Sequence, residues 1–410
     1  MRAACADLGH WQRRSWAFAL TVVLGYGLAT LPILVRHGFD PSAFIIAGDH
    51  YVDATQLASP IIVQPHSLGY DGEFYYRLAL SPFDLQQTAF GIRFDNQPYR
   101  MQRILYPLLV WATTFGHAEA VPVAMYLCNL MGLAAIAIFA KRLTARLRLA
   151  VQTPFAIMLW PGFLIALTHD TTEIVVVALL LAALDAYFAR RLVPYCALGG
   201  LATLTRETSV LVLGGVLCFE MIQAITRTAR DTSRWHRVLI CGFALIPLLV
   251  WQTVLHLVWG HTPQAGVGNL GWPFLGPIIM LRDTLTGVKQ FVQPNRPVLD
   301  AVVRTYVLES AGWLLVFCAS VAARVPAVLR MARIGALAAG WLPVITLMSL
   351  LTASGPWVDR NAYFRAFTEC YVVGCLVLGA RPPPRWLTCL MIAGGTLAFL
   401  GAFVVTVGEK

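Results

Sequence analysis

The sequence predicts an all-α protein, a multi-pass bundle of helices that cross a membrane. Of the 410 residues, 58% are hydrophobic and only 13% are charged, and the mean hydropathy is +0.66. Apolar runs of about 20 residues, the length that crosses about 30 Å of hydrocarbon, recur along the chain. The length alone would allow two or three soluble domains, but this composition is typical of an integral membrane protein. We therefore expect one integral membrane domain over residues 1–410.

The apolar runs predict about eleven crossings. The first, Ser15–Val35, is longer than a secretory signal and is not followed by a small-residue cleavage site, so we expect it to be an uncleaved span. The two runs that flank Thr205–Thr208 are short enough to be half-depth helices that meet at a break. The other expected spans are Val121–Ala140, Thr153–Leu167, Ile174–Ala189, Val193–Leu204, Ser209–Ile222, Val238–Trp259, Val307–Val321, Ile334–Thr352, Thr368–Ala380 and Trp386–Val407.

The distribution of basic residues predicts the orientation of the spans. Arg13, Arg14, the segment Lys141–Arg148 and Arg381 fall in alternate connections, whereas most carboxylates fall in the intervening ones. Because basic residues are enriched on the cytoplasmic side, the amino terminus is expected inside the cell. The net charge of +10 then reflects topology, and no nucleic-acid partner is expected. These features predict a multi-pass protein of an inner (plasma) membrane.

This orientation places two long loops, residues 36–117 and 261–304, on the extracytoplasmic side. The turns THDTTE (residues 168–173) and TRETS (residues 205–209) and the segment 355–369 face the same side. Polar residues from distant parts of the chain can therefore converge on one outward face. The nine cysteines are scattered singly without a CxxC pair, which favours apolar packing over a disulfide framework or a zinc site.

The first of these loops contains the densest polar cluster, GYDGEFYYRLALSP, at residues 69–82. Asp71 and Glu73 predict the start of a short helix that ends before Pro82, with Glu73 and Arg77 paired one turn apart. Such a helix would lie at the membrane interface, and residues 82–90 suggest a second one. From spacing alone, the simplest role for Asp71 is that of a helix N-cap.

The stretch YDGEFYYRLA resembles the signature WDxxxFxxIA in the first lumenal loop of GPI mannosyltransferase II and its relatives. The acid, the aromatic residue four positions later (Tyr75) and the Leu78–Ala79 pair match in register. Aminoarabinose transferases of lipid A carry a similar acid-then-Tyr pattern, and a set of bacterial membrane proteins with GYDGQFYY and RILYPLL segments is more similar still. TRETSVLVL resembles the ARSNGLL-like break of the mannosyltransferases, and THDTTE occupies the place of their PYSES.

The resemblance implies a C-type (GT-C) glycosyltransferase with many spans, interfacial helices in a large first outer loop, and a polyprenyl-phosphate sugar donor. Such an enzyme would transfer the sugar to a glycan, lipid or protein acceptor of the cell envelope at the periplasmic face, with inversion at the anomeric carbon. Tyr70 replaces the Trp of the signature, and Glu207 and Thr208 replace Ser and Asn, which weakens the case for mannose as the sugar. A lipid or glycan transporter or flippase is the alternative, although the mid-span charges and related halves of a transporter are not evident. An O-antigen ligase-like enzyme, with its basic loop at residues 261–304, is a weaker alternative.

The resemblance also assigns roles to individual residues. Asp71 would be the base that accepts the proton of the acceptor hydroxyl, Asp49 is the second candidate, and Glu73 would orient the acceptor or tune Asp71. Cations must stabilise the leaving phosphate, and arginine binds phosphate with a planar fork. The expected substrate-binding residues are Tyr75, Arg100, Arg103, Asp170, Glu173, Arg206, Arg360 and Arg365.

Several of these residues have simpler explanations. Arg100 and Arg103 precede an apolar run and can equally be bilayer anchors. Arg206 lies between two short apolar runs, where a cation is costly unless it is paired, and Glu207 beside it is the expected partner.

Two groups of residues have the types and spacing that a divalent cation, Mg or Mn, would accept. They are His169, Asp170 and Glu173 in one group, and Asp49, His50 and Asp53 in the other. Neither is a specific signature, and the dipole of the following helix also favours acids at 170 and 173, so no metal ligand is assigned.

Overall fold

The structure is a computed structural model. It describes residues 2–226, 232–264, 268–288, 297–332, 334–353, 355–357, 359 and 361–409. As the sequence predicts, the described chain is mostly helical. It divides into two compact units: unit 1 comprises Met1–Arg142, Ala166–Ser209 and Phe243–Ala265, and unit 2 comprises Leu143–Ile165, Val210–Gly242 and Gly266–Lys410.

Within the described ranges, six helices are long and apolar enough to cross a membrane: Ser15–Arg36, Val121–Leu147, Ser209–Thr226, Arg234–Trp259, Leu299–Leu329 and Arg385–Gly408. Shorter apolar helices cover Leu105–Thr114, Leu192–Thr205, Gly335–Leu350 and Thr368–Ala380. By the length and composition of these helices, the chain is a multi-pass membrane protein. The number of crossings and their orientation stay predictions.

Unit 1 contains long helices and a compact lobe formed by the first predicted loop. Its helices are α1 (Arg2–Arg36), α2 (Asp71–Leu80), α3 (Gln97–Met101), α4 (Leu105–Thr114), most of α5 (Val121–Leu147), α8 (Glu173–Phe188), α9 (Leu192–Thr205) and α12 (Ile246–Trp259). In the sequence, the lobe lies between α1 and α5. Two small sheets are part of it, a parallel pair β1 (Ala47–Gly48) and β2 (Val63–Gln64) and an antiparallel pair β3 (Thr88–Ala89) and β4 (Ile92–Arg93).

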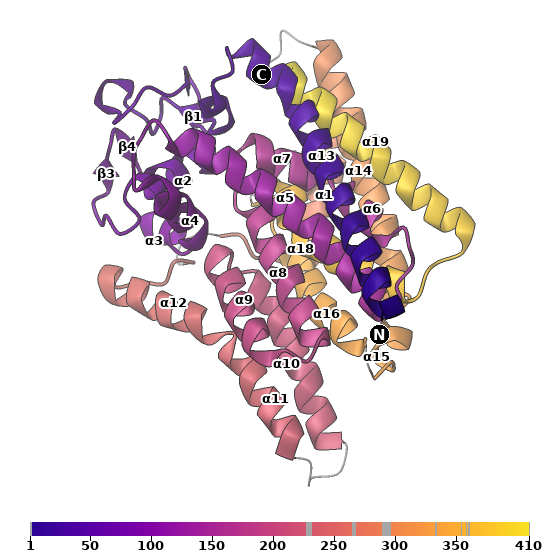
Figure 1. Ribbon diagram of the computed structural model, residues 1–410. Helices are drawn as coiled ribbons and strands as arrows, with labels where there is room; N and C mark the ends of the chain where they lie inside the picture. The colour runs from indigo at the N-terminus through magenta and orange to yellow at the C-terminus, as the bar shows by residue number, and fades with distance from the viewer. Residues whose placement is uncertain are drawn as a thin grey trace. The chain divides into compact units, whose positions relative to one another are not determined.

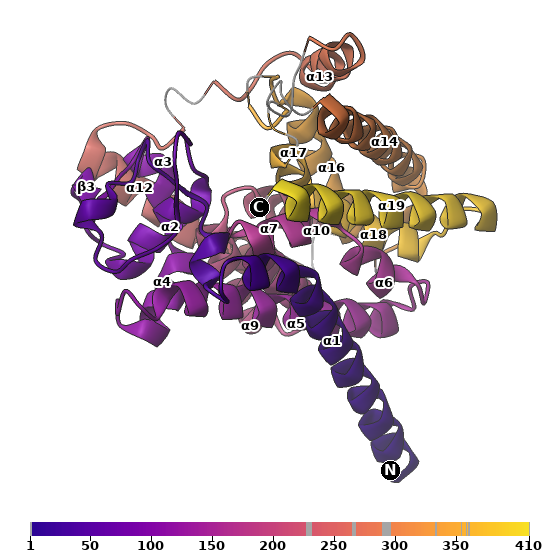
Figure 2. The same ribbon diagram turned by 90° about the horizontal axis from the view of Figure 1, so that it is seen from above.

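Helix α2 is the centre of this lobe (Figures 1 and 2). It packs against α3 and α4, and every residue from Gly72 to Leu80 is buried. The lobe therefore encloses this helix, including its charged residues Glu73 and Arg77. That the helix lies at the membrane interface stays a prediction. The second predicted helix, at residues 82–90, is absent from the structure: this segment leads into the β3–β4 hairpin.

Unit 2 is formed mainly by the carboxy-terminal helices. They are α6 (Thr153–Met158), α10 (Ser209–Thr226), α11 (Thr232–Phe243), α13 (Leu275–Leu285), α14 (Pro297–Ala322), α15 (Val325–Leu329), α16 (Gly335–Leu350), α17 (Ala362–Ala366), α18 (Thr368–Ala380) and α19 (Arg385–Glu409). Helix α18 is buried from Thr368 to Gly379, and α14, α16 and α6 pack around it. Helices α14 and α19 run side by side in Figures 1 and 2.

Two expected spans differ from the structure in detail. The run Thr153–Leu167 is interrupted after Met158, and α7 (Pro161–Thr168) begins at a proline, which lacks the N–H group that a continuous helix needs. The expected break at Thr205–Thr208 is present. Helix α10, which follows this break, has 18 residues and is by length and composition a candidate for a full span. Whether the two helices cross only half of the membrane stays a prediction.

Candidate functional site

The candidate site is built on the first turn of α2, in unit 1. The N-cap residue of α2 is Tyr70 and makes no side-chain capping bond, so Asp71 is the first residue of the helix and not its cap. The carboxylate Oδ1 of Asp71 lies 2.5 Å from Nη1 of Arg100, and 21% of the Asp71 side chain is exposed. The prediction that Asp71 is merely a helix N-cap is therefore wrong. Its carboxylate is partly accessible and is oriented by a cation.

Arg100 joins Asp71 to a second carboxylate. Its Nε and Nη2 atoms donate to the two oxygens of Asp95 at 2.8 and 2.6 Å, a bidentate pair, while its guanidinium carbon lies 4.4 Å above the ring centre of Phe74. The short helix α3 holds this geometry, because the Asn96 side chain caps its first turn. With 12% of its side chain exposed, Arg100 is part of an ion-pair network and not a bilayer anchor.

Arg103, one turn further along, connects α2 to the distant TRETS turn. Its Nε and Nη2 donate to the two oxygens of Glu207 at 3.0 and 2.7 Å, and its Nη1 lies 3.3 Å from the hydroxyl of Tyr75 on α2. Burial alone would raise the pKa of Glu207, but the charge of Arg103 outweighs this effect and lowers that pKa to about 2. Arg103 is buried, so the interpretation as an anchor is wrong here too.

Arg206 has a different neighbour from the one that the sequence suggests. Helix α9 ends at Thr205 because Arg206 adopts an extended conformation (φ −157°, ψ 125°). Its Nη2 then lies 3.9 Å from Oε1 of Glu173, the first residue of α8, and both side chains are buried. The expected Arg206–Glu207 pair is thus replaced by Arg206–Glu173 and Arg103–Glu207.

The THDTTE turn packs directly against the start of α2. A methyl group added at Gly72 would lie 2.6 Å from the carbonyl oxygen of His169, so only glycine permits this approach. The His169 ring meets the Tyr70 ring edge to face, with 4.7 Å between the ring centres. The next residue, Asp170, is fully buried in a left-handed conformation (φ 45°). The structure therefore brings the two predicted motifs together.

Glu73 is buried next to the strand β1. The backbone N–H of Gly48 donates to its Oε2 at 2.9 Å, and its Oε1 has no hydrogen-bond partner among the described residues. Gly69 (φ +64°) allows this contact, because an added methyl group would lie 2.3 Å from Oε2. Burial raises the pKa of Glu73 to about 8, so the carboxyl group is largely protonated at neutral pH.

The expected ion pair between Glu73 and Arg77 is not formed. The Arg77 guanidinium donates instead to the backbone carbonyl oxygens of Gln87, at 2.6 Å, and Gln86. It stacks on Phe94, 3.8 Å from the ring centre, and its burial lowers its pKa to about 10. Arg77 thus fixes the segment that precedes the β3–β4 hairpin to α2.

Asp49, the second candidate for the base, closes a turn. Its two carboxylate oxygens accept the backbone N–H groups of His66 and Ser67 at 2.8 and 3.1 Å, and these bonds lower the pKa of Asp49. Asp53 caps the short 3₁₀ helix Ala54–Gln56 in the same manner. In the part of the chain that the structure describes, no group of three or more His, Cys, Asp or Glu side chains is arranged to hold a metal ion.

One further predicted residue, Arg365, belongs to unit 2. Arg365 is buried on α17, and Arg360 lies outside the described residues. Sequence reasoning missed Asp95 as a site residue, and it treated Glu207 only as a neighbour of Arg206. The signal for Asp95 was local, since an acid followed by Asn-Gln-Pro precedes the helix that carries Arg100.

Comparisons with known proteins add little to this description. No family model matches the chain, and no curated protein matches it. Among solved structures, the chain is similar to one described as "Crystal Structure of ArnT from Cupriavidus metallidurans in the apo state". The identity is 12% and the TM-score is 0.43, with 94% of this chain and 76% of that chain covered. At this score the similarity does not establish a shared fold or a shared activity.

Proposed function

We propose that this protein is an integral membrane glycosyltransferase of the C type. It moves a sugar from a polyprenyl-phosphate donor to a glycan, lipid or protein acceptor of the cell envelope, at the periplasmic face. The observation that supports this most is the Asp71–Arg100 pair at the first turn of α2, where a partly exposed carboxylate is held by a guanidinium at 2.5 Å. A base for an acceptor hydroxyl needs this combination of fixed orientation and access.

In the proposed reaction, the acceptor oxygen forms a bond to the anomeric carbon while the bond from that carbon to the phosphate oxygen breaks. The acceptor proton passes to the carboxylate of Asp71, and the polyprenyl phosphate leaves with the electron pair. The Arg100–Asp95 pair orients Asp71, and the Arg103–Tyr75 contact fixes α2 to the TRETS turn. Asp71 and the acceptor oxygen then lie on the face of the sugar opposite the leaving phosphate. Attack from that face inverts the configuration at the anomeric carbon.

Cations bind the leaving phosphate in this proposal. Arg206 is the first candidate, since it lies at the break after α9, next to the turn that Arg103 holds. Glu173 positions that cation, and Asp170 is assigned to the substrate from the sequence alone. Arg360 and Arg365 are assigned to the donor from the sequence alone. Glu73 and Asp49 support the loop instead of reacting.

The test is a transfer assay with purified full-length protein in lipid vesicles that contain extracted polyprenyl-phosphate sugars. A transferase releases free polyprenyl phosphate in proportion to acceptor modification, and mass spectrometry measures both. Cells that lack the protein should lose one envelope glycan modification. Movement of the intact sugar lipid across the bilayer without cleavage would contradict the proposal and support a flippase.

The side of the membrane is tested separately. Ser67 and Arg146 are each replaced by cysteine, and intact cells are treated with a membrane-impermeant thiol reagent. The cysteine at 67 should react and the one at 146 should not. The reverse labelling would place the site in the cytoplasm, where nucleotide sugars would be the more natural donors.

A further inference from the structure

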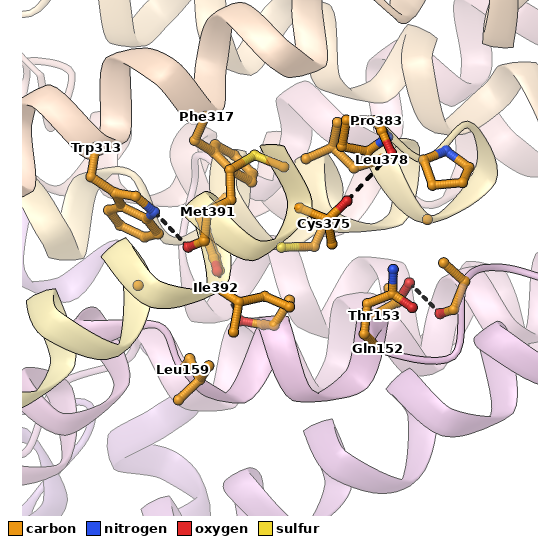
Figure 3. Close-up of a pocket in the computed structure, with 17 residues that line it drawn as sticks. Gln152, Thr153, Leu159, Trp313, Phe317, Cys375, Leu378, Pro383, Met391 and Ile392 are labelled. Carbon is orange, nitrogen blue, oxygen red and sulfur yellow. Dashed lines mark hydrogen bonds between the residues drawn. The ribbon is translucent and has the colours of Figure 1, made fainter. Parts of the chain in front are cut away.

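Unit 2 contains a cavity between α6, α14, α18 and α19, and Figure 3 shows the side chains that line it. Its free volume is about 50 Å³, whereas small-molecule sites usually have about 300–1,000 Å³. A polar group at its wall is bonded to the protein, since Trp313 Nε1 donates to the carbonyl oxygen of Met391 at 2.9 Å. The cavity is therefore a gap in helix packing and not a substrate site. Groups that can reach a substrate lie in unit 1 instead.

In unit 1, Glu207 of the TRETS turn has a carboxylate that the proposed reaction does not use. Arg103 donates to both of its oxygens, at 2.7 Å to Oε1 and 3.0 Å to Oε2, yet 20% of the Glu207 side chain is exposed. Each carboxylate oxygen can accept two hydrogen bonds, and Arg103 supplies one to each. Glu207 therefore has accepting capacity left for a ligand at this surface.

The Glu207 carboxylate repeats the arrangement of Asp71. In each pair an arginine holds a carboxylate whose side chain is about one fifth exposed: 21% for Asp71 beside Arg100, and 20% for Glu207 beside Arg103. The half-buried ring of Tyr99 lies next to both pairs. Its centre is 5.4 Å from the guanidinium carbon of Arg100 and 5.2 Å from that of Arg103. The two carboxylates therefore belong to one partly exposed polar surface of unit 1.

The neighbours of Glu207 indicate which part of the substrate would meet it. Tyr75 lies one turn of α2 after Asp71, and Arg103 donates to its hydroxyl at 3.3 Å, so the Arg103–Glu207 pair adjoins the helix that carries the proposed base. Arg206, the first candidate for binding the leaving phosphate, directly precedes Glu207 in the chain. In the proposed reaction the transferred sugar connects these two places, because its anomeric carbon is bonded to the phosphate and is attacked by the acceptor at Asp71.

We propose that Glu207 binds a hydroxyl group of the sugar that is transferred, while Arg103 holds the Glu207 carboxylate in place. This role rests on the proposed transferase function and adds a requirement for the donor, a free sugar hydroxyl group that faces Glu207. The carboxylate is ionised at neutral pH, because the charge of Arg103 lowers the pKa of Glu207 to about 2, so it only accepts hydrogen bonds. A donor sugar whose hydroxyl at this position is absent or methylated would leave that carboxylate without its bond.

The test measures recognition of the sugar separately from binding of the phosphate. Full-length protein in lipid vesicles is supplied with extracted polyprenyl-phosphate sugars, and the KM for this donor mixture is determined from initial rates of transfer. Undecaprenyl phosphate, which has the phosphate and the tail but no sugar, is the competing inhibitor. We expect Glu207→Gln to raise the KM about tenfold, because a hydrogen bond to a charged group is about twice as strong as one to a neutral group. The inhibition constant of undecaprenyl phosphate should not change.

Two control variants separate a sugar contact from a structural role, and the unfolding temperature of each variant shows whether it has folded. The double variant Arg103→Met, Glu207→Gln removes the charge pair as a whole. If Glu207 were only the partner of Arg103, this variant should regain the wild-type KM, whereas a sugar contact keeps the KM raised. Asp185→Asn removes a carboxylate that pairs with Arg142 at 2.9 Å toward the other end of α8, and it should change neither constant.

Three results would each overturn the role of Glu207. They are an unchanged KM in Glu207→Gln, an equal rise of the KM and the inhibition constant in that variant, and a wild-type KM in the double variant. When the wild type transfers sugar, any of these results refutes the sugar contact alone. An absence of transfer by the wild type would refute the transferase function and the role of Glu207 together.

Discussion

Replacing Glu73 by Gln should remove a pH dependence of stability that the wild type shows near neutrality. Glu73 is fully buried, one of its oxygens accepts the Gly48 N–H at 2.9 Å, and burial raises its pKa from 4.5 to about 8. Between these two values the folded protein holds a proton that the unfolded chain releases. Stability is therefore fully present below about pH 4.5 and falls as the pH rises toward about 8.

The magnitude follows from the proton difference. One proton held only by the folded state gives a slope of about 1.4 kcal/mol per pH unit, so the wild type should lose about 2–3 kcal/mol between pH 6 and pH 8. The Gln side chain keeps the shape and the acceptor for Gly48 but does not titrate. The variant should therefore lack this slope.

The assay is thermal unfolding of the purified protein in detergent from about pH 6 to about pH 8. Asp53→Asn is the matched control, because the bonds from Thr55 lower the pKa of Asp53 and confine its contribution to acidic pH. The control should keep the wild-type slope. An equal slope in wild type and Glu73→Gln would refute the argument from burial.

Three other predictions concern the site. Asp71→Asn should leave folding unchanged but reduce sugar transfer by about two to four orders of magnitude, the usual weight of a positioned base, and near-wild-type transfer in the vesicle assay would exclude that role. Arg103→Met should lower the free energy of unfolding by about 1–3 kcal/mol, because it removes the bidentate partner of the half-buried Glu207. Adding Glu207→Gln should recover much of this loss in a double-mutant cycle, and additive losses would show that the pair is not coupled. Gly72→Ala should lower the free energy of unfolding by about 1–3 kcal/mol, because the new methyl group meets backbone oxygens at 2.5 and 2.6 Å. Gly25→Ala is the control and should be tolerated, because nothing lies within 4 Å of its new methyl group. Equal changes in unfolding temperature in the two variants would contradict the contact at Gly72.

Local features of the site could be predicted from the sequence. Helix α2 begins at Asp71 and ends before Pro82 as expected, because helix signals depend on residues within one or two turns. Its burial was also visible in principle. Phe74, Tyr75 and Leu78 give the helix apolar residues on more than one face, which is typical of a helix that is buried within a protein.

The pairing of charges could not be predicted in the same manner. Adjacency in sequence does not decide which side chains pair, since Arg206 pairs with Glu173 although Glu207 follows it directly. The partner of Glu207 is Arg103, and nothing in the local sequence of either residue identifies the other. Such pairs depend on how the helices and turns pack, which one sequence without relatives does not reveal.

The distance between these two partners along the chain also has a consequence for biosynthesis. Arg103 and Glu207 are 104 residues apart. At about 5–20 residues per second, the ribosome adds this length in roughly 5–20 s, and the first loop exists during that time without its partner carboxylate. The ionic network around α2 is therefore completed only after the helices up to α9 have been synthesised. A nascent chain that stops before residue 207 should carry the first loop in an open, protease-sensitive form.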